Sequence, residues 1–213
     1  MSEILSIISS TIIDGKKDDI VQLTQQALDK GLKATEIVDN GLMKGMEVVG
    51  ARFKSGDMFV PEVMRCARTM LNAMEILDPI LAETGAKMVG KVLLGTVKGD
   101  LHDIGKNLVG MMCRGAGFQV QDLGIDVQPE AFVKAVKEFQ PDVLGMSALL
   151  TTTMRTMGDT IKALEEAGVR ETVKIMVGGA PVTQAFADNI GANGYAANAP
   201  AAADLAKKFA AAA

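Results

Sequence analysis

The chain has 213 residues, of which 48% are hydrophobic and 23% charged, a composition typical of a globular protein. Its net charge of −4 provides no basic surface, so nucleic acid is not an expected partner. No run approaches the roughly 18 apolar residues of a membrane span, and the first twenty residues do not resemble a signal peptide. We therefore expect a cytoplasmic protein without a membrane partner. Cys66 and Cys113 form no C-x-x-C pair, which argues against a disulfide scaffold or a zinc site and predicts two buried thiols.

The first 86 residues have a helical pattern. Apolar residues recur there at spacings of three and four, which places them along one side of a helix. We expect four helices, over residues 4–12, 18–31, 35–53 and 61–81. Because one such helix cannot bury its apolar stripe alone, the pattern predicts an all-α domain over residues 1–86, a four-helix bundle that ends in a linker at 83–86.

Beyond the linker, short β-rich runs alternate with helical ones. The expected strands are 92–97, 118–122, 143–147, 173–177 and 193–196. The expected helices are 105–115, 130–139, 154–167, 183–190 and an alanine-rich tail. This alternation predicts an α/β domain over residues 87–213, with a doubly wound, flavodoxin- or Rossmann-like sheet of five parallel strands.

Unusual residues collect directly after these strands, in the loops 96–107, 147–153, 178–181 and 195–198. The carboxyl ends of parallel strands meet at one edge of a sheet, which is where such folds bind ligands. The four loops therefore predict a single site.

His102 is the only histidine in the chain and lies in the first of these loops. A lone histidine is more often a surface or core residue than a ligand. Here Asp100 precedes it by two residues, and a carboxylate on one imidazole nitrogen raises the basicity of the other. Gly105 permits close backbone approach as the next helix begins. One histidine cannot anchor a bare ion, but it could supply one axial ligand to a metal held in a macrocycle.

Two phosphate readings are alternatives. The Walker pattern fails because five residues separate Gly99 from Gly105 and because Asn107 stands where Ser or Thr is needed, and the dinucleotide G-x-G-x-x-G is absent. A receiver-like phospho-acceptor site could use Asp100, Asp103 or Asp122, but it leaves the helical half and the Gly178-Gly179 pair without a role.

Three motifs together resemble a known family. Asp100-x-His102-x-x-Gly105, then 41 residues, then Ser147-x-Leu149, then 28 residues, then Gly178-Gly179 resembles the cobalamin-binding signature of methionine synthase and the corrinoid methyl-carrier proteins. Residues 56–64 resemble the cap segment that precedes this domain in those proteins. The resemblance covers nearly the whole chain in the same domain order.

The resemblance implies a role for each matching residue. His102 corresponds to the axial cobalt ligand of a base-off, His-on cobalamin, Asp100 to its hydrogen-bonded partner, and Thr153 to the hydroxyl that completes a relay, the three residues we assign to the chemistry. The implied cofactor-binding residues are Asp100, His102, Asp103, Gly105, Ser147, Leu149, Thr151, Gly178 and Gly179, with Phe59 on the upper face of the corrin. Without the resemblance, Ser147 and Thr151–Thr153 would be interpreted as helix caps. Gly178 and Gly179 would be interpreted as a turn, and Leu149 as a core residue.

The implied function is that of a methyl carrier, not catalytic alone, whose cofactor alternates between methylcobalamin and cob(I)alamin. The implied partners are a substrate-specific methyltransferase, a second methyltransferase that uses tetrahydrofolate or coenzyme M, and a reductive activator protein. Three alternatives remain: a cobalamin-dependent sensor or regulator, a corrinoid storage protein, and a mutase subunit. The helical cap argues against the mutase.

Overall fold

The structure is a computed structural model that describes residues 3–84 and 88–211. The chain divides into two compact units. The first comprises Met1–Met88 with Gly115–Gly117, and the second comprises Val89–Arg114 with Phe118–Ala213. The boundary predicted after residue 86 lies outside the described residues and stays a prediction.

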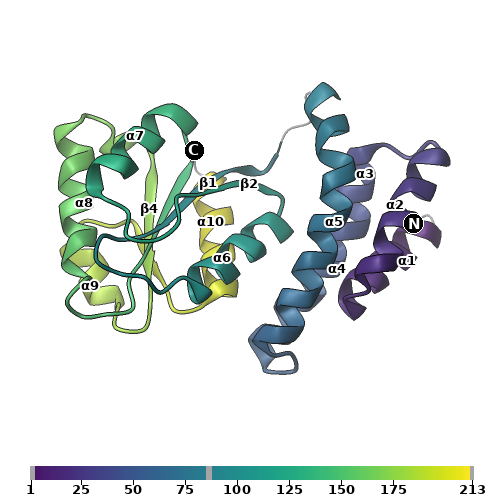
Figure 1. Cartoon of the computed structure of the whole chain (residues 1–213), viewed down its shortest axis with the longest axis horizontal. Helices are drawn as coiled ribbons and strands as arrows, with labels where there is room; N and C mark the ends of the chain where they lie inside the picture. Colours follow the sequence, from purple (N-terminus) through teal and green to yellow (C-terminus); the bar gives the residue numbers. More distant parts are fainter. Residues whose placement is uncertain (1–2, 85–87, 212–213) are drawn as a thin grey trace. The chain divides into compact units, whose positions relative to one another are not determined.

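The helical unit contains the predicted bundle (Figure 1). Its elements are α1 (Glu3–Asp14), α2 (Lys17–Asp29), α3 (Ala34–Ile37), η1 (Val38–Leu42), α4 (Met43–Ser55) and α5 (Val60–Thr84). The third predicted helix is the continuous run from α3 to α4, and η1 is a turn of π-helix within it that the apolar spacing does not predict. The prediction of an all-α N-terminal region is confirmed.

Two glycines let this third helix pack closely on α1. A Cβ at Gly41 would lie 2.9 Å from Cγ2 of Ile8, and one at Gly45 would lie 2.7 Å from Cβ of Ile12. Both isoleucines are fully buried. The close approach of the two backbones therefore depends on the missing side chains.

The turn between α4 and α5 carries an exposed aromatic side chain. Gly56 ends α4 in a left-handed conformation with φ 85°, and the carboxylate of Glu62 accepts a hydrogen bond of 2.8 Å from the amide of Phe59 as α5 begins. The Phe59 side chain between these caps is 70% exposed within the chain.

The second unit is a parallel sheet of five strands in the order β2-β1-β3-β4-β5, which confirms the predicted fold class. The strands are β1 (Gly90–Thr96), β2 (Phe118–Asp122), β3 (Val143–Ser147), β4 (Lys174–Gly178) and β5 (Gly194–Ala196). The helices are α6 (Ile104–Gly115), α7 (Pro129–Phe139), α8 (Arg155–Glu166), α9 (Gln184–Asn189) and α10 (Ala199–Ala210), with the short 3₁₀ helix η2 (Arg170–Thr172).

Helices cover both faces of this sheet. Helices α7, α8 and α9 bury side chains in one core with β1, β3 and β4, whereas α6 and α10 lie on the other face (Figure 1). The chain order reverses between β1 and β3, and ligands of such sheets bind at this switch point, beyond the carboxyl ends of the strands. The loops after β1 and β3 are therefore the natural place for a site.

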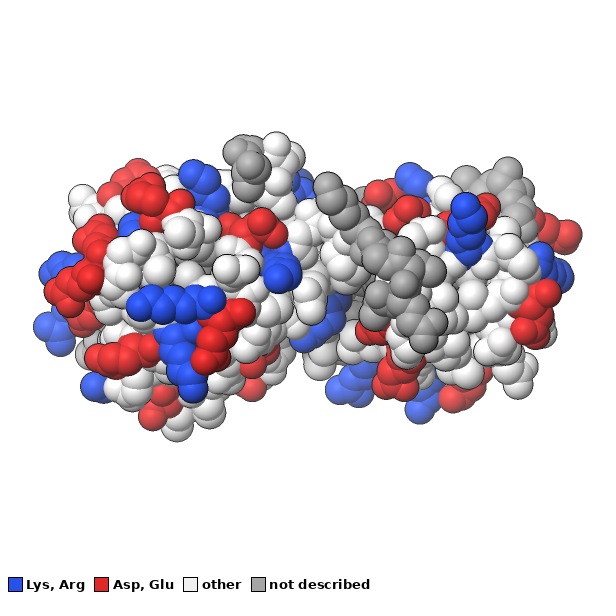
Figure 2. All heavy atoms as spheres, turned by 90° about the horizontal axis from the view of Figure 1, so that it is seen from above, with Lys and Arg blue, Asp and Glu red and all other residues white. Residues whose placement is uncertain are grey.

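Three further features bear on the sequence predictions. Cys66 and Cys113 are both buried free thiols, as predicted, and burial raises the pKa of Cys113 to about 12. Within the described ranges, no helix is both long and apolar enough to cross a bilayer. On the face shown in Figure 2, Lys and Arg side chains are interspersed with Asp and Glu side chains.

Candidate functional site

The loop after β1 is fixed by hydrogen bonds to its backbone groups. Gly99 turns the chain with φ 81° and donates its amide to Oδ1 of Asp126 at 2.6 Å. The Asp126 amide donates to the carbonyl of Asp100 at 3.0 Å, and the Thr96 hydroxyl donates to the carbonyl of His102 at 3.1 Å. The segment that carries Asp100 and His102 is thus held at both residues.

Asp100 is fully buried and joins the loops after β1 and β3. Its Oδ1 accepts hydrogen bonds from the His102 amide at 3.1 Å and from Nδ1 of His102 at 2.8 Å. Its Oδ2 accepts from the amides of Leu149 and Leu150 at 2.8 and 3.2 Å, and from the Thr153 hydroxyl at 2.6 Å. The predicted partners Asp100, His102 and Thr153 therefore form one connected network.

These contacts determine the charge of Asp100. Burial acts to raise the pKa of the carboxyl, but the hydrogen bonds from Thr153, from the amide and ring of His102 and from Leu149 outweigh it and hold this pKa well below its usual range. Asp100 is therefore a carboxylate at neutral pH and acts only as an acceptor. It follows that Nδ1 of His102 carries the proton in the contact with Asp100.

The outer nitrogen of His102 is then available as a ligand. With the proton on Nδ1, the neutral imidazole has its lone pair on Nε2, which is the form that binds a metal. The His102 side chain is 51% exposed, although its Asp100 partner is fully buried. Within the described residues, no group of three or more His, Cys, Asp and Glu side chains could hold a metal ion. His102 is thus positioned to supply a single ligand.

The two glycines after β4 allow the strand ends to meet. A Cβ at Gly179, where φ is 126°, would lie 1.9 Å from the carbonyl oxygen of Ala148, and a Cβ at Gly178 would lie 3.0 Å from the carbonyl oxygen of Ala196. The close approach of the Ala148 backbone is therefore one reason why position 179 requires glycine. Gly105 differs, since a Cβ there would meet no atom within 4 Å.

Exposed apolar side chains flank the histidine. Leu101 and Ile104, on the same loop and the start of α6, are 65% and 73% exposed, and Leu149 and Leu150 on the loop after β3 are each 42% exposed. Four large apolar residues on the loops around one polar ligand suit a flat, largely apolar molecule better than a phosphate.

The comparisons with known proteins agree with this geometry. Two family models, each described as a B12 binding domain, match residues 90–204 and 7–78. A corrinoid protein of Desulfitobacterium hafniense (strain Y51) is 45% identical over 97% of both chains, and dimethylamine corrinoid protein 2 of Methanosarcina acetivorans is 45% identical over 97% of this chain and 96% of that protein. The chain belongs to the family of B12-binding corrinoid proteins. Its cofactor is cobalamin, and corrinoid proteins of this kind work with methyltransferases.

Solved structures of corrinoid proteins have the same fold. The methanol:cobalamin methyltransferase complex MtaBC of Methanosarcina barkeri matches with a TM-score of 0.89 at 34% identity, over all of this chain and 81% of that one. A cobalamin-binding protein of Desulfitobacterium hafniense DCB-2 matches with a TM-score of 0.78 at 32% identity, over 96% of this chain and 98% of that one.

The residues around His102 fit a corrinoid. His102 could offer one nitrogen to a metal whose other ligands come from a macrocycle, and the four exposed leucine and isoleucine side chains would provide apolar surface beside it. The space beside Gly105 is open at the start of α6, where part of a corrinoid would have room. On these grounds we propose cofactor roles for His102 and Gly105.

The other predicted residues fall into different places. Leu149 contributes its backbone amide to Asp100, Ser147 is half-buried at the end of β3, and Thr151 is exposed beside the network. Asp103 accepts a hydrogen bond from Asn107 rather than from His102. Phe59 lies in the helical unit. The cofactor roles of these residues remain predictions.

Sequence reasoning missed one part of the site and one buried lysine on α6. The Leu150 amide reaches Asp100 through the backbone, so its residue type carries no signal. Lys106 is 4% exposed and pairs with Asp122. A signal for Lys106 does exist, because it stands on the buried stripe that continues at Gly110 and Cys113 of α6.

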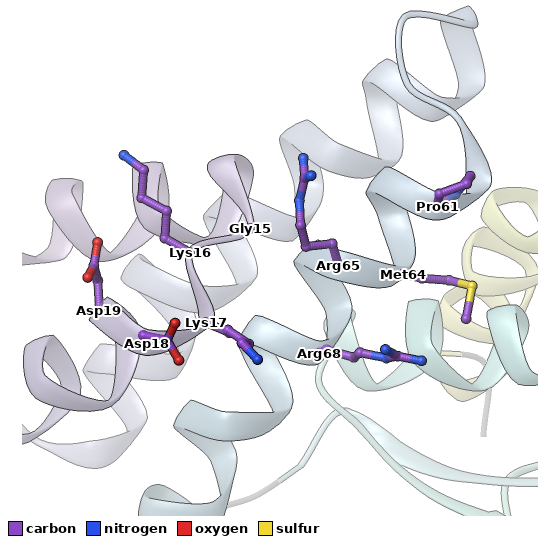
Figure 3. A pocket seen from close by; sticks show the side chains of 9 residues that line it. All are labelled: Gly15, Lys16, Lys17, Asp18, Asp19, Pro61, Met64, Arg65 and Arg68. Carbon is purple, nitrogen blue, oxygen red and sulfur yellow. The ribbon is translucent and has the colours of Figure 1, made fainter.

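A separate pocket lies in the helical unit, between the α1–α2 turn and α5 (Figure 3). It is lined by Gly15, Lys16, Lys17, Asp18, Asp19, Pro61, Met64, Arg65 and Arg68. None of the predicted site residues lines it. Its charges are of both signs, and Lys16 pairs with Asp14 at 2.9 Å.

Proposed function

We propose that this protein carries a methyl group on the cobalt of cobalamin, bound base-off with His102 as the axial ligand. The observation that carries the proposal is the pair formed by Asp100 and His102: a buried carboxylate, held ionised, that accepts the Nδ1 proton of a half-exposed imidazole. Metal-bound histidines in proteins are usually held in this way.

The cofactor supplies the transfer chemistry, since its cobalt accepts and releases the methyl group. The residues of this chain control the ligand. Asp100 fixes the tautomer and orientation of His102 and stabilises positive charge on the ring, while the Thr153 hydroxyl and two amides stabilise the carboxylate. The strength of the hydrogen bond from Nδ1 of His102 to Asp100 would then adjust how strongly Nε2 donates to a metal.

The partners we propose are a substrate-specific methyltransferase, a second methyltransferase that uses tetrahydrofolate or coenzyme M, and a reductive activator. Support comes from the relatives: several of nearly equal length are named as dimethylamine or trimethylamine corrinoid proteins, and a solved relative forms a methanol:cobalamin methyltransferase complex. We also propose that Phe59, exposed at the turn before α5, covers the cobalt face opposite His102.

The test compares the wild-type protein with His102→Ala. Each apo-protein is mixed with hydroxocobalamin, desalted, and examined by visible spectroscopy. We expect colour to be retained and the spectrum to shift when His102 is removed. Addition of imidazole should restore the wild-type spectrum in His102→Ala. A folded wild-type protein that emerges colourless, or identical spectra for the two proteins, would contradict the proposal.

A further inference from the structure

Lys106 places an ammonium group beneath the first turn of α6. Its side chain is 3% exposed, and its Nζ donates hydrogen bonds to the carboxylate of Asp122, at the end of β2, and to Oδ1 of Asn107 at 2.9 Å. A buried ammonium is costly unless it is paired, and a buried pair often stabilises a protein no more than apolar side chains would. Stability alone therefore gives no reason for a lysine here.

The contacts of Lys106 continue toward His102. Nδ2 of Asn107 donates to Oδ2 of Asp103 at 3.0 Å, and the amide of Asn107 donates to the carbonyl of Asp103 at 2.8 Å. Asp103 directly follows His102. Asp122 is itself fixed, because its Oδ1 accepts a hydrogen bond of 2.9 Å from the amide of Gly124. A chain of polar contacts thus runs from β2 to the residue next to the histidine.

The histidine is consequently held from two sides. Asp100 fixes the ring through Nδ1 and is tied to the loop after β3. The Lys106 contacts lead through the Asn107 side chain to the carboxylate of Asp103, the residue after His102, and are tied to β2. A ligand must be held to within a fraction of an ångström, so the ring contact and the backbone contact are both needed to aim Nε2.

We propose that Lys106, through its pair with Asp122, is a positioning residue for the His102 ligand. It touches Asn107, Asn107 holds Asp103, and Asp103 fixes the backbone from which the imidazole projects. The inference rests on the proposed function, in which His102 ligates cobalt, and adds a residue to it that needs no contact with the cofactor.

The experiment uses the full chain and Lys106→Met, which keeps the length of the side chain and removes its charge. Since His102 is the only histidine, selective ¹⁵N labelling of histidine gives NMR signals from this ring alone in the apo-protein. At fixed pH, we expect the share of the Nδ1–H tautomer to fall. In the methylcobalamin-loaded protein, the equilibrium constant for His102 ligation should fall on the order of tenfold, as for other residues that support metal ligands.

A double variant separates positioning from stability. Lys106→Met with Asp122→Leu replaces the ion pair with an apolar pair, and we expect it to regain the wild-type unfolding temperature. It cannot hold Asn107, so the histidine signals and the cofactor spectrum should stay altered. Asp122→Asn, at a residue whose side chain is 29% exposed, is the further variant if Lys106→Met fails to fold.

Arg170→Met is the matched control. Like Lys106→Met, it removes a long cationic side chain that donates hydrogen bonds. The Arg170 bonds go to the carbonyls of Val173 and Gly191, at the amino end of β4 and away from His102. It should lower stability and leave the His102 signals unchanged. A wild-type tautomer and spectrum in Lys106→Met, or their recovery in the double variant, would overturn the inference. If His102→Ala itself matches the wild-type spectrum, the proposed function fails instead.

Discussion

The Asp100 carboxylate links stability to ligand geometry. Five hydrogen-bond donors from two loops converge on it, and they favour its ionised form despite complete burial. The same carboxylate orients the His102 ring. The hydrogen bonds that stabilise the folded loops therefore also fix the orientation of the ring. Changes at this residue should therefore affect unfolding and ligation together.

Asp100→Asn should lower the free energy of unfolding by roughly 1–3 kcal/mol at pH 7, because buried donors lose a charged acceptor. The folded pKa of Asp100 is lowered, and the unfolded value is about 3.9. Between these values the unfolded chain binds more protons, so wild-type stability falls as the pH drops below about 4. The difference in unfolding free energy between the wild type and Asp100→Asn should therefore narrow over this range. Urea unfolding of the two apo-proteins at pH 7, 5, 4 and 3 measures it.

The control for this measurement is Asp188→Asn, because Asp188 is exposed and its side chain accepts a hydrogen bond from the exposed side chain of Gln184. Its unfolding free energy at pH 7 should differ little from that of the wild type. A constant difference between Asp100→Asn and the wild type down to pH 3 would show that Asp100 does not titrate with folding in this way.

Two glycines of the site should respond in opposite ways to alanine. Gly179→Ala forces a Cβ onto the Ala148 carbonyl at a positive φ, so we expect a loss of about 3 kcal/mol or more in unfolding free energy. Gly105→Ala meets open space in a helix and should stabilise the apo-protein by roughly 0.5 kcal/mol. It should nevertheless weaken cobalamin binding, measured by equilibrium dialysis. Unweakened binding would remove Gly105 from the site.

How far the sequence predicts the site differs from residue to residue. Asp100 and His102 could be predicted to meet from their spacing, and the family resemblance adds Thr153 on the neighbouring loop. Leu150 could not, because it acts through its amide. The pairing of Lys106 with Asp122 could not be predicted either, because Asp122 lies on another strand.

At the scale of elements, periodicity predicts the strands within a few residues but not local changes of helix type. The strand expected at 143–147 is β3 with the same bounds, whereas the helix expected over 35–53 contains η1. The π turn changes the phase of the buried stripe by one residue, which apolar spacings of three and four absorb without a visible break.

The same substitution should also have opposite effects in two helices. Gly45→Ala in α4 would place a Cβ 2.7 Å from Ile12 and 2.8 Å from the Ser9 carbonyl, so we expect a loss of about 1–3 kcal/mol in unfolding free energy. Gly158→Ala in α8 meets Ile190 at an ordinary 3.5 Å and should gain about 0.5–1 kcal/mol. Chemical denaturation followed by circular dichroism measures both, and equal effects would show that α1 and α4 can separate without cost.

At the scale of the whole molecule, the chain divides into two compact units. Within the described residues, the hydrogen bonds that hold His102 come from the sheet unit, and the helical unit has its own core. The B12-binding descriptions nevertheless extend over both. Phe59 is the side chain through which we expect the helical unit to act on the cofactor.

Phe59→Ala tests whether the Phe59 side chain covers the cofactor. The ring is 70% exposed, so its loss should change the unfolding free energy of the apo-protein by no more than about 0.5 kcal/mol. In the loaded protein, we expect cyanide to replace the hydroxo ligand of bound hydroxocobalamin severalfold faster, because an apolar cover over the cobalt is lost. Ile7→Ala, which removes another exposed apolar side chain of the helical unit, should leave the rate unchanged. Equal rates in wild type and Phe59→Ala, measured by stopped-flow spectroscopy, would mean that Phe59 does not cover the cofactor and would leave its exposure to be explained by a partner protein.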